Sequence, residues 1–216
     1  MQSMIVIGDS NVCRLRIPNS DIKNLSKSGM SFNDVPKFIS NVKTNETVRS
    51  VVVHLGTNDV KHVDKTVVVV KRAKNPLISL KDKWLGAKIA YSSIIPRVGK
   101  STVVKQFNSD ATFIKNSILQ YCLSTKRFRY IDIDEIFLNN GAVAKSLYDP
   151  DDPSGIHVNI DGSVSLYDNL EAFLERCISD ERDLVPLGKK RLRSRESITS
   201  PSEAQRFKQG KTVDVD

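Results

Sequence analysis

The chain has few cysteines and no long apolar run, and both absences limit what it can be. Cys13, Cys122 and Cys177 form neither an even set nor a CxxC pair, so neither a disulfide framework nor a zinc knuckle is predicted. No apolar run approaches the roughly 20 residues that span a bilayer. The start, MQSMIVIGDSN, lacks the basic and apolar regions of a signal peptide. We therefore expect an intracellular protein, cytoplasmic or nuclear, without a membrane span.

Aromatic residues are also scarce, at 6% of the chain, whereas basic residues are in excess. The net charge of +8 makes nucleic acid or another polyanion a partner to consider. Of this excess, +6 lies in residues 1–179 and +2 in residues 180–216, where 189–195 has the sequence KKRLRSR. Nuclear localisation and weak phosphate binding are hypotheses for that run. Because no aromatic residue alternates with it, a base-stacking platform is not indicated there.

The length of 216 residues and a hydrophobic content of 39% fit one globular domain with a tail. Apolar periodicity stops after Cys177, and the remaining residues are rich in Ser, Lys, Arg and Asp. We therefore predict a domain over residues 1–179 and a basic, disordered tail over residues 180–216.

Five segments have the pattern of strands. Short apolar runs that lead into loops predict buried strands at 4–8, 51–56 and 87–95. Segments 22–29 and 128–134 alternate apolar and polar residues and are further candidates.

Between these segments, apolar residues recur at helical spacing. The four sets are Val35, Phe38, Ile39 and Val42; Ala73, Leu77, Leu80 and Trp84; Val103, Phe107, Ile114, Ile118 and Cys122; and Leu166, Leu170, Phe173, Leu174 and Cys177. Pro76 predicts a kink or break in the second helix, and Asn159 or Asp161 is expected to cap the last one. Strands alternating with helices predict an α/β fold with a parallel sheet covered on both faces.

Polar and glycine residues follow the predicted strands at the edge where open parallel sheets bind ligands. The segments are Gly8-Asp9-Ser10-Asn11, Ser28-Gly29-Met30, Gly56-Thr57-Asn58-Asp59 and, before the last helix, Gly155-Ile156-His157. Acyl transfer requires a nucleophile, a base that accepts its proton, and N–H donors for the oxyanion. These four segments could supply all three.

In these four blocks, and over about its first 180 residues, the chain resembles the SGNH hydrolases, also called GDSL-type lipases and esterases. The resemblance implies a three-layer α/β/α sandwich around a mostly parallel five-stranded sheet, as in flavodoxin-like folds. It implies that Ser10 is the nucleophile and His157 the general base. The oxyanion hole would consist of the backbone N–H groups of Ser10 and Gly29 and the side-chain amide of Asn58. No metal or organic cofactor is implied.

One position departs from the family pattern. The family has an Asp three residues before the histidine, and here that residue is Ser154. A serine hydroxyl can accept a hydrogen bond from the imidazole but has no charge to stabilise an imidazolium. Asp152 is the closest substitute in the sequence, with Asp149 and Asp151 as others, and a backbone carbonyl could instead orient His157 in a Ser-His dyad.

The remaining candidate residues have simpler interpretations. His54 lies within a predicted strand and is expected in the core, and His62 is expected at a solvated helix start. Asp9 and Asp59 are expected to fix turns through backbone N–H groups. Arg97 follows the strand at 87–95, where it is either a surface residue or a contact for an anionic substrate.

The sequence therefore favours a serine hydrolase that cleaves a carboxylic ester, such as an acetyl ester of a carbohydrate or a small lipid ester. The alternative is a catalytically weak or inactive accessory module of the same fold, derived from a mobile element, that contacts nucleic acid through its basic tail.

Overall fold

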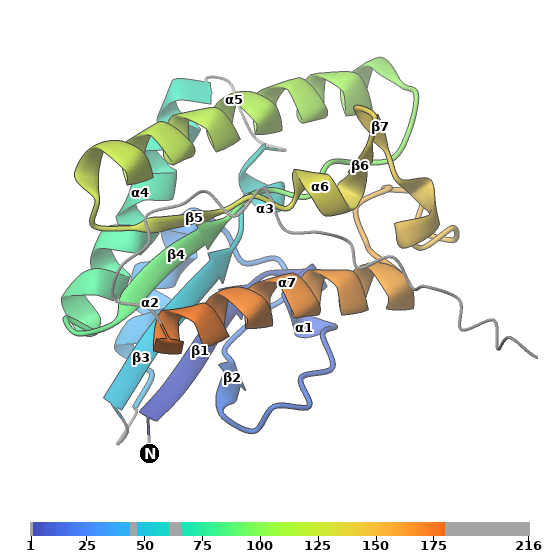
Figure 1. Cartoon of the computed structure of the whole chain (residues 1–216). Coiled ribbons are helices and arrows are strands. Elements are labelled where there is room, and N and C mark those ends of the chain that lie inside the picture. The colour runs from blue at the N-terminus through green and yellow to red at the C-terminus, as the bar shows by residue number, and fades with distance from the viewer. Residues whose placement is uncertain (1, 44–46, 61–65, 180–216) are drawn as a thin grey trace, which may run out of the picture.

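The computed structural model describes residues 2–43, 47–60 and 66–179. Its centre is a parallel sheet with strand order β2-β1-β3-β4-β5 (Figure 1). The strands are β1 Gln2–Gly8, β2 Ile22–Asn24, β3 Thr47–His54, β4 Lys88–Ser92 and β5 Arg129–Ile131. Each coincides at least in part with one of the five predicted segments, so the predicted parallel sheet is confirmed.

Helices follow the strands along the chain. They are α1 Ser10–Cys13, α2 Val35–Ser40, α3 Thr57–Val60, α4 Thr66–Lys83, α5 Thr102–Thr125, α6 Asp134–Phe137 and α7 Ile160–Ser179. Two short 3-10 turns, Phe32–Asp34 and Lys145–Leu147, also occur. None of the described helices is long and apolar enough to cross a membrane.

A small hairpin was not expected. Its strands are β6 Leu138–Asn139 and β7 Ala142–Val143, which pair antiparallel. The two residues between them, Asn140 and Gly141, have φ values of +49° and +79°. An Asn-Gly pair with positive φ is a common two-residue hairpin turn, so the signal was present, but strands of two residues are too short to show periodicity.

Two apolar layers cover the sheet. On one face, α2, α4 and α5 bury residues such as Leu77 and Ile118 against the strands. On the other face, α7 buries Leu166 and Leu170, and α1 buries Val12 (Figure 1). The arrangement is a three-layer α/β/α sandwich, as the resemblance implied.

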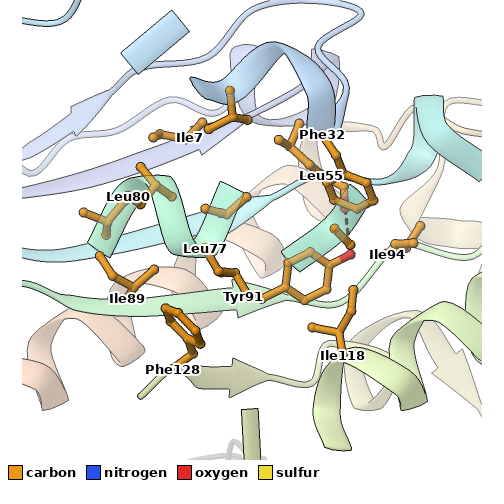
Figure 2. Packing of buried hydrophobic residues seen from close by; sticks show 14 of the residues in the cluster. Ile7, Phe32, Leu55, Leu77, Leu80, Ile89, Tyr91, Ile94, Ile118 and Phe128 are labelled. Atoms are coloured by element: carbon orange, nitrogen blue, oxygen red, sulfur yellow. Dashed lines mark hydrogen bonds between the residues drawn. The ribbon is translucent and has the colours of Figure 1, made fainter. Parts of the chain in front are cut away.

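Tyr91 of β4 links the apolar layer under α2, α4 and α5 to the loop after β3. Its ring is fully buried among side chains of α4 and α5, near Leu77 and Ile118, and its hydroxyl donates a 2.9 Å hydrogen bond to the Leu55 carbonyl (Figure 2). Burial raises the pKa of Tyr91 well above its ordinary value. The neutral hydroxyl therefore fixes the chain just before Gly56, where the third polar segment begins.

The predicted break at Pro76 and the predicted burial of Val103 are wrong, whereas a kink at Pro76 stays a prediction. Helix α4 continues through Pro76 without a break; Ala73, Leu77 and Leu80 are fully buried along it, which offsets the backbone hydrogen bond that proline cannot donate. Val103 is 69% exposed rather than on the buried face, because α5 meets the core only from Phe107 onward. The tail at 180–216 lies outside the described residues.

His54 is a core residue, as predicted. Its side chain is 1% exposed at the end of β3, and its Nδ1 lies 3.1 Å from the Ser92 hydroxyl of β4. Burial lowers the pKa of His54 to about 4. The imidazole is therefore neutral at physiological pH, and protonation would destabilise the fold.

His54→Asn should remove a pH-dependent part of the stability. The pKa of His54 in the fold, about 4, lies below the roughly 6.5 of an unfolded chain. Its neutral form stabilises the fold fully above the unfolded pKa, and this contribution is lost as pH falls. Between about pH 7 and pH 4, the wild type should lose about 3 kcal/mol of unfolding free energy relative to the variant. Urea unfolding at several pH values measures this difference, and a constant difference would contradict the assignment.

Candidate active site

The turn after β1 presents Ser10 at the carboxyl edge of the sheet. Asp9 is the N-cap of α1, with its carboxylate accepting a 3.1 Å hydrogen bond from the Asn11 backbone N–H. A Cβ on Gly8 would lie 2.2 Å from the Val12 side chain, so only glycine fits before this turn. Ser10 is half-buried as the first residue of α1. Asp9 thus has the turn-fixing contact that the sequence predicted.

Asn11 joins this turn to the segment that contains His157. Its side chain is fully buried and forms two hydrogen bonds to distant parts of the chain, at sequence separations of 145 and 147 residues. Its Nδ2 donates to the Ile156 carbonyl and its Oδ1 accepts from the Val158 N–H, both at 3.3 Å. These two residues flank His157, so Asn11 holds the turns that contain Ser10 and His157 side by side.

The segment before His157 is folded around the carboxylate of Asp152. This carboxylate accepts hydrogen bonds from the Ser154 N–H (3.0 Å), the Ser154 hydroxyl (2.7 and 2.8 Å), the Ile156 N–H (2.9 Å) and the His157 N–H (2.8 Å). Its Oδ2 also lies 3.1 Å from Nδ1 of His157. One aspartate therefore both shapes the loop and contacts the imidazole.

The contact between Asp152 and His157 answers the question that Ser154 raised. Burial alone would raise the pKa of Asp152, but hydrogen bonds from His157, Ser154 and Ile156 hold that pKa well below its ordinary value. The carboxylate is therefore ionised at neutral pH. Ser154 does not face the imidazole in its place, since its hydroxyl donates to Asp152. Asp149 accepts instead from the Asp151 N–H and fixes the preceding turn.

Arg97 and Gly155 fasten this loop to the segment after β4. The guanidinium of Arg97 donates to the Ser154 carbonyl from Nε at 3.1 Å and from Nη2 at 2.8 Å. The Val98 N–H donates to the Gly155 carbonyl at 2.9 Å. Gly155 has a φ of +61°, and a Cβ there would lie 2.2 Å from the Val98 oxygen. Arg97 is thus part of the loop's support; its contact with substrate stays a prediction.

The loops that carry Gly29 and Asn58 are tied together on the other side of the turn. Nδ2 of Asn58, in α3, donates to the Met30 carbonyl at 3.0 Å. The carboxylate of Asp59 accepts from the Phe32 N–H at 3.0 and 3.2 Å. Burial raises the pKa of Asp59 to about 6, although the Phe32 hydrogen bond opposes this shift. Asp59 is thus a turn-fixing residue, as predicted.

Asn11 is the site residue that the sequence reasoning missed. It stood within the first block, but its side-chain partners are far away in the chain, so no local pattern identified it.

His62 lies outside the described residues. Within the described ranges, no three His, Cys, Asp or Glu side chains are grouped so that they could hold a metal ion.

No protein-family model and no curated protein matches the sequence. Solved structures do resemble the fold. A provisionally assigned platelet activating factor from Streptococcus pneumonia is 16% identical, with a TM-score of 0.69, over 80% of this chain and 83% of that chain. A GDSL-like lipase from Bacteroides thetaiotaomicron is 13% identical, with a TM-score of 0.61, over 81% of this chain and 88% of that chain.

The OSK domain of Drosophila Oskar is also similar, at 17% identity and a TM-score of 0.61, over 79% of this chain and 87% of that chain. At these identities the likeness concerns the fold alone. Together with the strand order, it shows that the chain has the fold of the SGNH hydrolases.

Gly155→Ala should be more damaging than Gly141→Ala. Both glycines have positive φ, +61° and +79°, so each variant incurs backbone strain of about 1 kcal/mol. Only at position 155 does the added Cβ meet a backbone oxygen, which should cost a further 1–3 kcal/mol or so. Urea unfolding of the two variants measures the difference. Equal losses would show that Val98 and Gly155 are not held in contact.

Proposed function

We propose that this chain, which has the SGNH hydrolase fold, is a serine hydrolase that cleaves carboxylic esters with Ser10, His157 and Asp152. The observation that carries the proposal is the position of the Asp152 carboxylate, 3.1 Å from Nδ1 of His157. The Asn11 hydrogen bonds add support, because they hold the His157 loop against the Ser10 turn. A carboxylate, an imidazole and a hydroxyl are the components of a hydrolytic triad.

In the proposed reaction, Oγ of Ser10 attacks the carbonyl carbon of the ester while Nε2 of His157 accepts its proton. The tetrahedral intermediate collapses, and His157 returns the proton to the departing alcohol. Water then attacks the acyl-serine with the same assistance, which releases the carboxylic acid and restores Ser10. Throughout, Asp152 holds the imidazole through Nδ1 and stabilises its positive charge.

The oxyanion would be bound by the backbone N–H groups of Ser10 and Gly29 and by the Asn58 amide. Two features favour this assignment. Asn58 uses one N–H of its amide to donate to the Met30 carbonyl, which orients the group and leaves its second N–H for the oxyanion. Gly29 is exposed and has a φ of +75°, a backbone conformation that suits glycine, so its backbone is open to solvent at the carboxyl edge. Preorganised donors of this kind supply much of the rate enhancement in acyl transfer.

The proposed substrate class is that of the SGNH resemblance. We expect an acetyl ester of a carbohydrate or a small lipid ester, with Arg97 near the loop that carries the base. The competing assignment is an accessory module of the same fold with little catalysis. The Asp152 contact favours the enzyme, because the hydrogen bonds that fold the loop come from Ser154 and from backbone N–H groups, whereas the contact with Nδ1 of His157 is the one that a triad requires.

Covalent labelling with a fluorophosphonate probe tests whether Ser10 is an activated nucleophile. The wild type should react, and Ser10→Ala and His157→Ala should both abolish labelling, because one removes the attacking oxygen and the other the base. Ser40→Ala, at an exposed serine of α2, is the matched control and should label normally. Absence of labelling in folded wild-type protein would refute the proposal and support the accessory module.

Asp152→Asn should lower kcat for an activated acetyl ester by about 10⁴-fold, as in other triads that lose their carboxylate charge. Asp151→Asn, at the exposed neighbouring position, should leave kcat within about 2-fold, since surface substitutions away from the site have small effects. Circular dichroism verifies that both variants are folded. Equal activity of wild type and Asp152→Asn would mean that a backbone group orients His157 instead.

A further inference from the structure

The edge of the sheet opposite the candidate active site carries a dense group of cations. Helix α4 ends at Lys83 just before β4 begins at Lys88, and α5 ends at Thr125 just before β5 begins at Arg129. Since β4 and β5 pair in parallel, both connections lie at the same edge (Figure 1). This edge is formed by the amino ends of the strands, whereas Ser10 and Asn58 follow carboxyl ends.

The two connections, residues 81–88 and 126–129, contain six basic residues and one acidic residue. We call the six the basic edge: Lys81, Lys83, Lys88, Lys126, Arg127 and Arg129. The acidic residue, Asp82, is 3.4 Å from Nη2 of Arg127, with 49% of the Arg127 side chain and 63% of the Asp82 side chain exposed. One exposed pair contributes little, and Lys81 donates a 2.8 Å hydrogen bond to the Ala87 carbonyl. The formal net charge of the two connections is +5.

Two of these cations, one from each connection, are close enough to affect one another. Burial and the charge of Arg127 lower the pKa of Lys81, although the two residues are 46 positions apart in the sequence. Cations at helix C-termini are favoured by the helix dipole, which accounts for Lys81 and Lys83. It does not account for Arg129, which lies in β5. Helix stabilisation alone therefore does not explain the group.

We propose that the basic edge binds the phosphate backbone of a single-stranded nucleic acid. Arginine and lysine side chains from two adjacent connections can contact successive phosphates. The turn at 84–87 adds apolar surface for unpaired bases, since Leu85 is 74% exposed and Trp84 is half-buried beside Lys83, whose Nζ is 5.5 Å from the indole centroid. A nucleic acid bound there would leave the carboxyl edge of the sheet open.

An anionic membrane is the less favoured partner. Insertion into a bilayer requires several exposed apolar side chains near the charges. Of the described residues in the two connections, Leu85 is the one large apolar side chain that is exposed, because Trp84 packs against the core. A single-stranded nucleic acid uses the charges, the exposed Leu85 and the half-buried indole of Trp84 together.

Fluorescence anisotropy with a labelled 20-nucleotide oligo-dT and the full chain tests the proposal. The triple variant Lys83→Gln, Lys126→Gln, Arg127→Gln should bind at least tenfold more weakly at about 0.1 M KCl. The slope of log affinity against log salt should fall by about 2, since each lost contact to a single strand removes about 0.7. The tail with its KKRLRSR run is present in the wild type and in every variant, so its contribution to oligo-dT affinity cancels in the comparison.

The matched control is the triple variant Arg16→Gln, Lys37→Gln, Lys105→Gln. It removes one arginine and two lysines, all exposed and none in the basic edge. It should leave the salt slope unchanged, and thermal melts should show that both triple variants are folded. Equal weakening by the two triples would overturn the proposal, because it would indicate attraction by net charge alone. Absence of oligo-dT binding at low salt would also overturn the proposal. So would a first triple variant that loses binding to phosphatidylserine vesicles but not to oligo-dT, which would assign the edge to membranes.

Discussion

The carboxylate of Asp152 is the interaction on which the candidate site depends. It gathers three backbone N–H groups and one hydroxyl from the five residues that follow it, and it contacts the imidazole of His157. A buried carboxylate without donors would be costly. With these donors it stays charged, and their hydrogen bonds hold the loop in its observed conformation. The group that orients the histidine is therefore also the group that folds the loop.

The other parts of the site are joined by a similar device, a side chain that hydrogen bonds to the backbone of a distant segment. Asn11 joins the Ser10 turn to the His157 loop, and Asn58 and Asp59 join the loops after β3 and β2. Each of these hydrogen bonds forms only if the sheet places the two segments at the same edge. The in-register pairing of Gly8 with His54, and of His54 with Ser92, provides that alignment. The basic edge lies at the other end of the same strands, so the proposed polyanion site and the candidate active site are separate on the molecule.

Much of the fold could be predicted because its signals are local. Buried parallel strands read as short apolar runs, and amphipathic helices repeat every 3.6 residues. The predictions of a break at Pro76 and of a buried Val103 were wrong because tertiary packing decided both: Pro76 is accommodated within α4, and Val103 lies before the point where α5 reaches the core. The β6–β7 hairpin was missed because its strands are too short for a pattern, although Asn140-Gly141 marks its turn.

For the site, the sequence by itself determined which residue types follow each strand: a serine after β1, glycines and an asparagine after β2 and β3, and a histidine before α7. These depend on chain order and strand patterning, which are properties of the linear sequence. Only the tertiary structure decided that Asp152 rather than Asp149, Asp151 or a backbone carbonyl contacts His157. That choice depends on the chain reversal at Gly155, which requires a positive φ and the close approach of the Val98 carbonyl. It equally depends on the two hydrogen bonds of Asn11, whose partners are about 145 residues away and are brought near only when the sheet has formed.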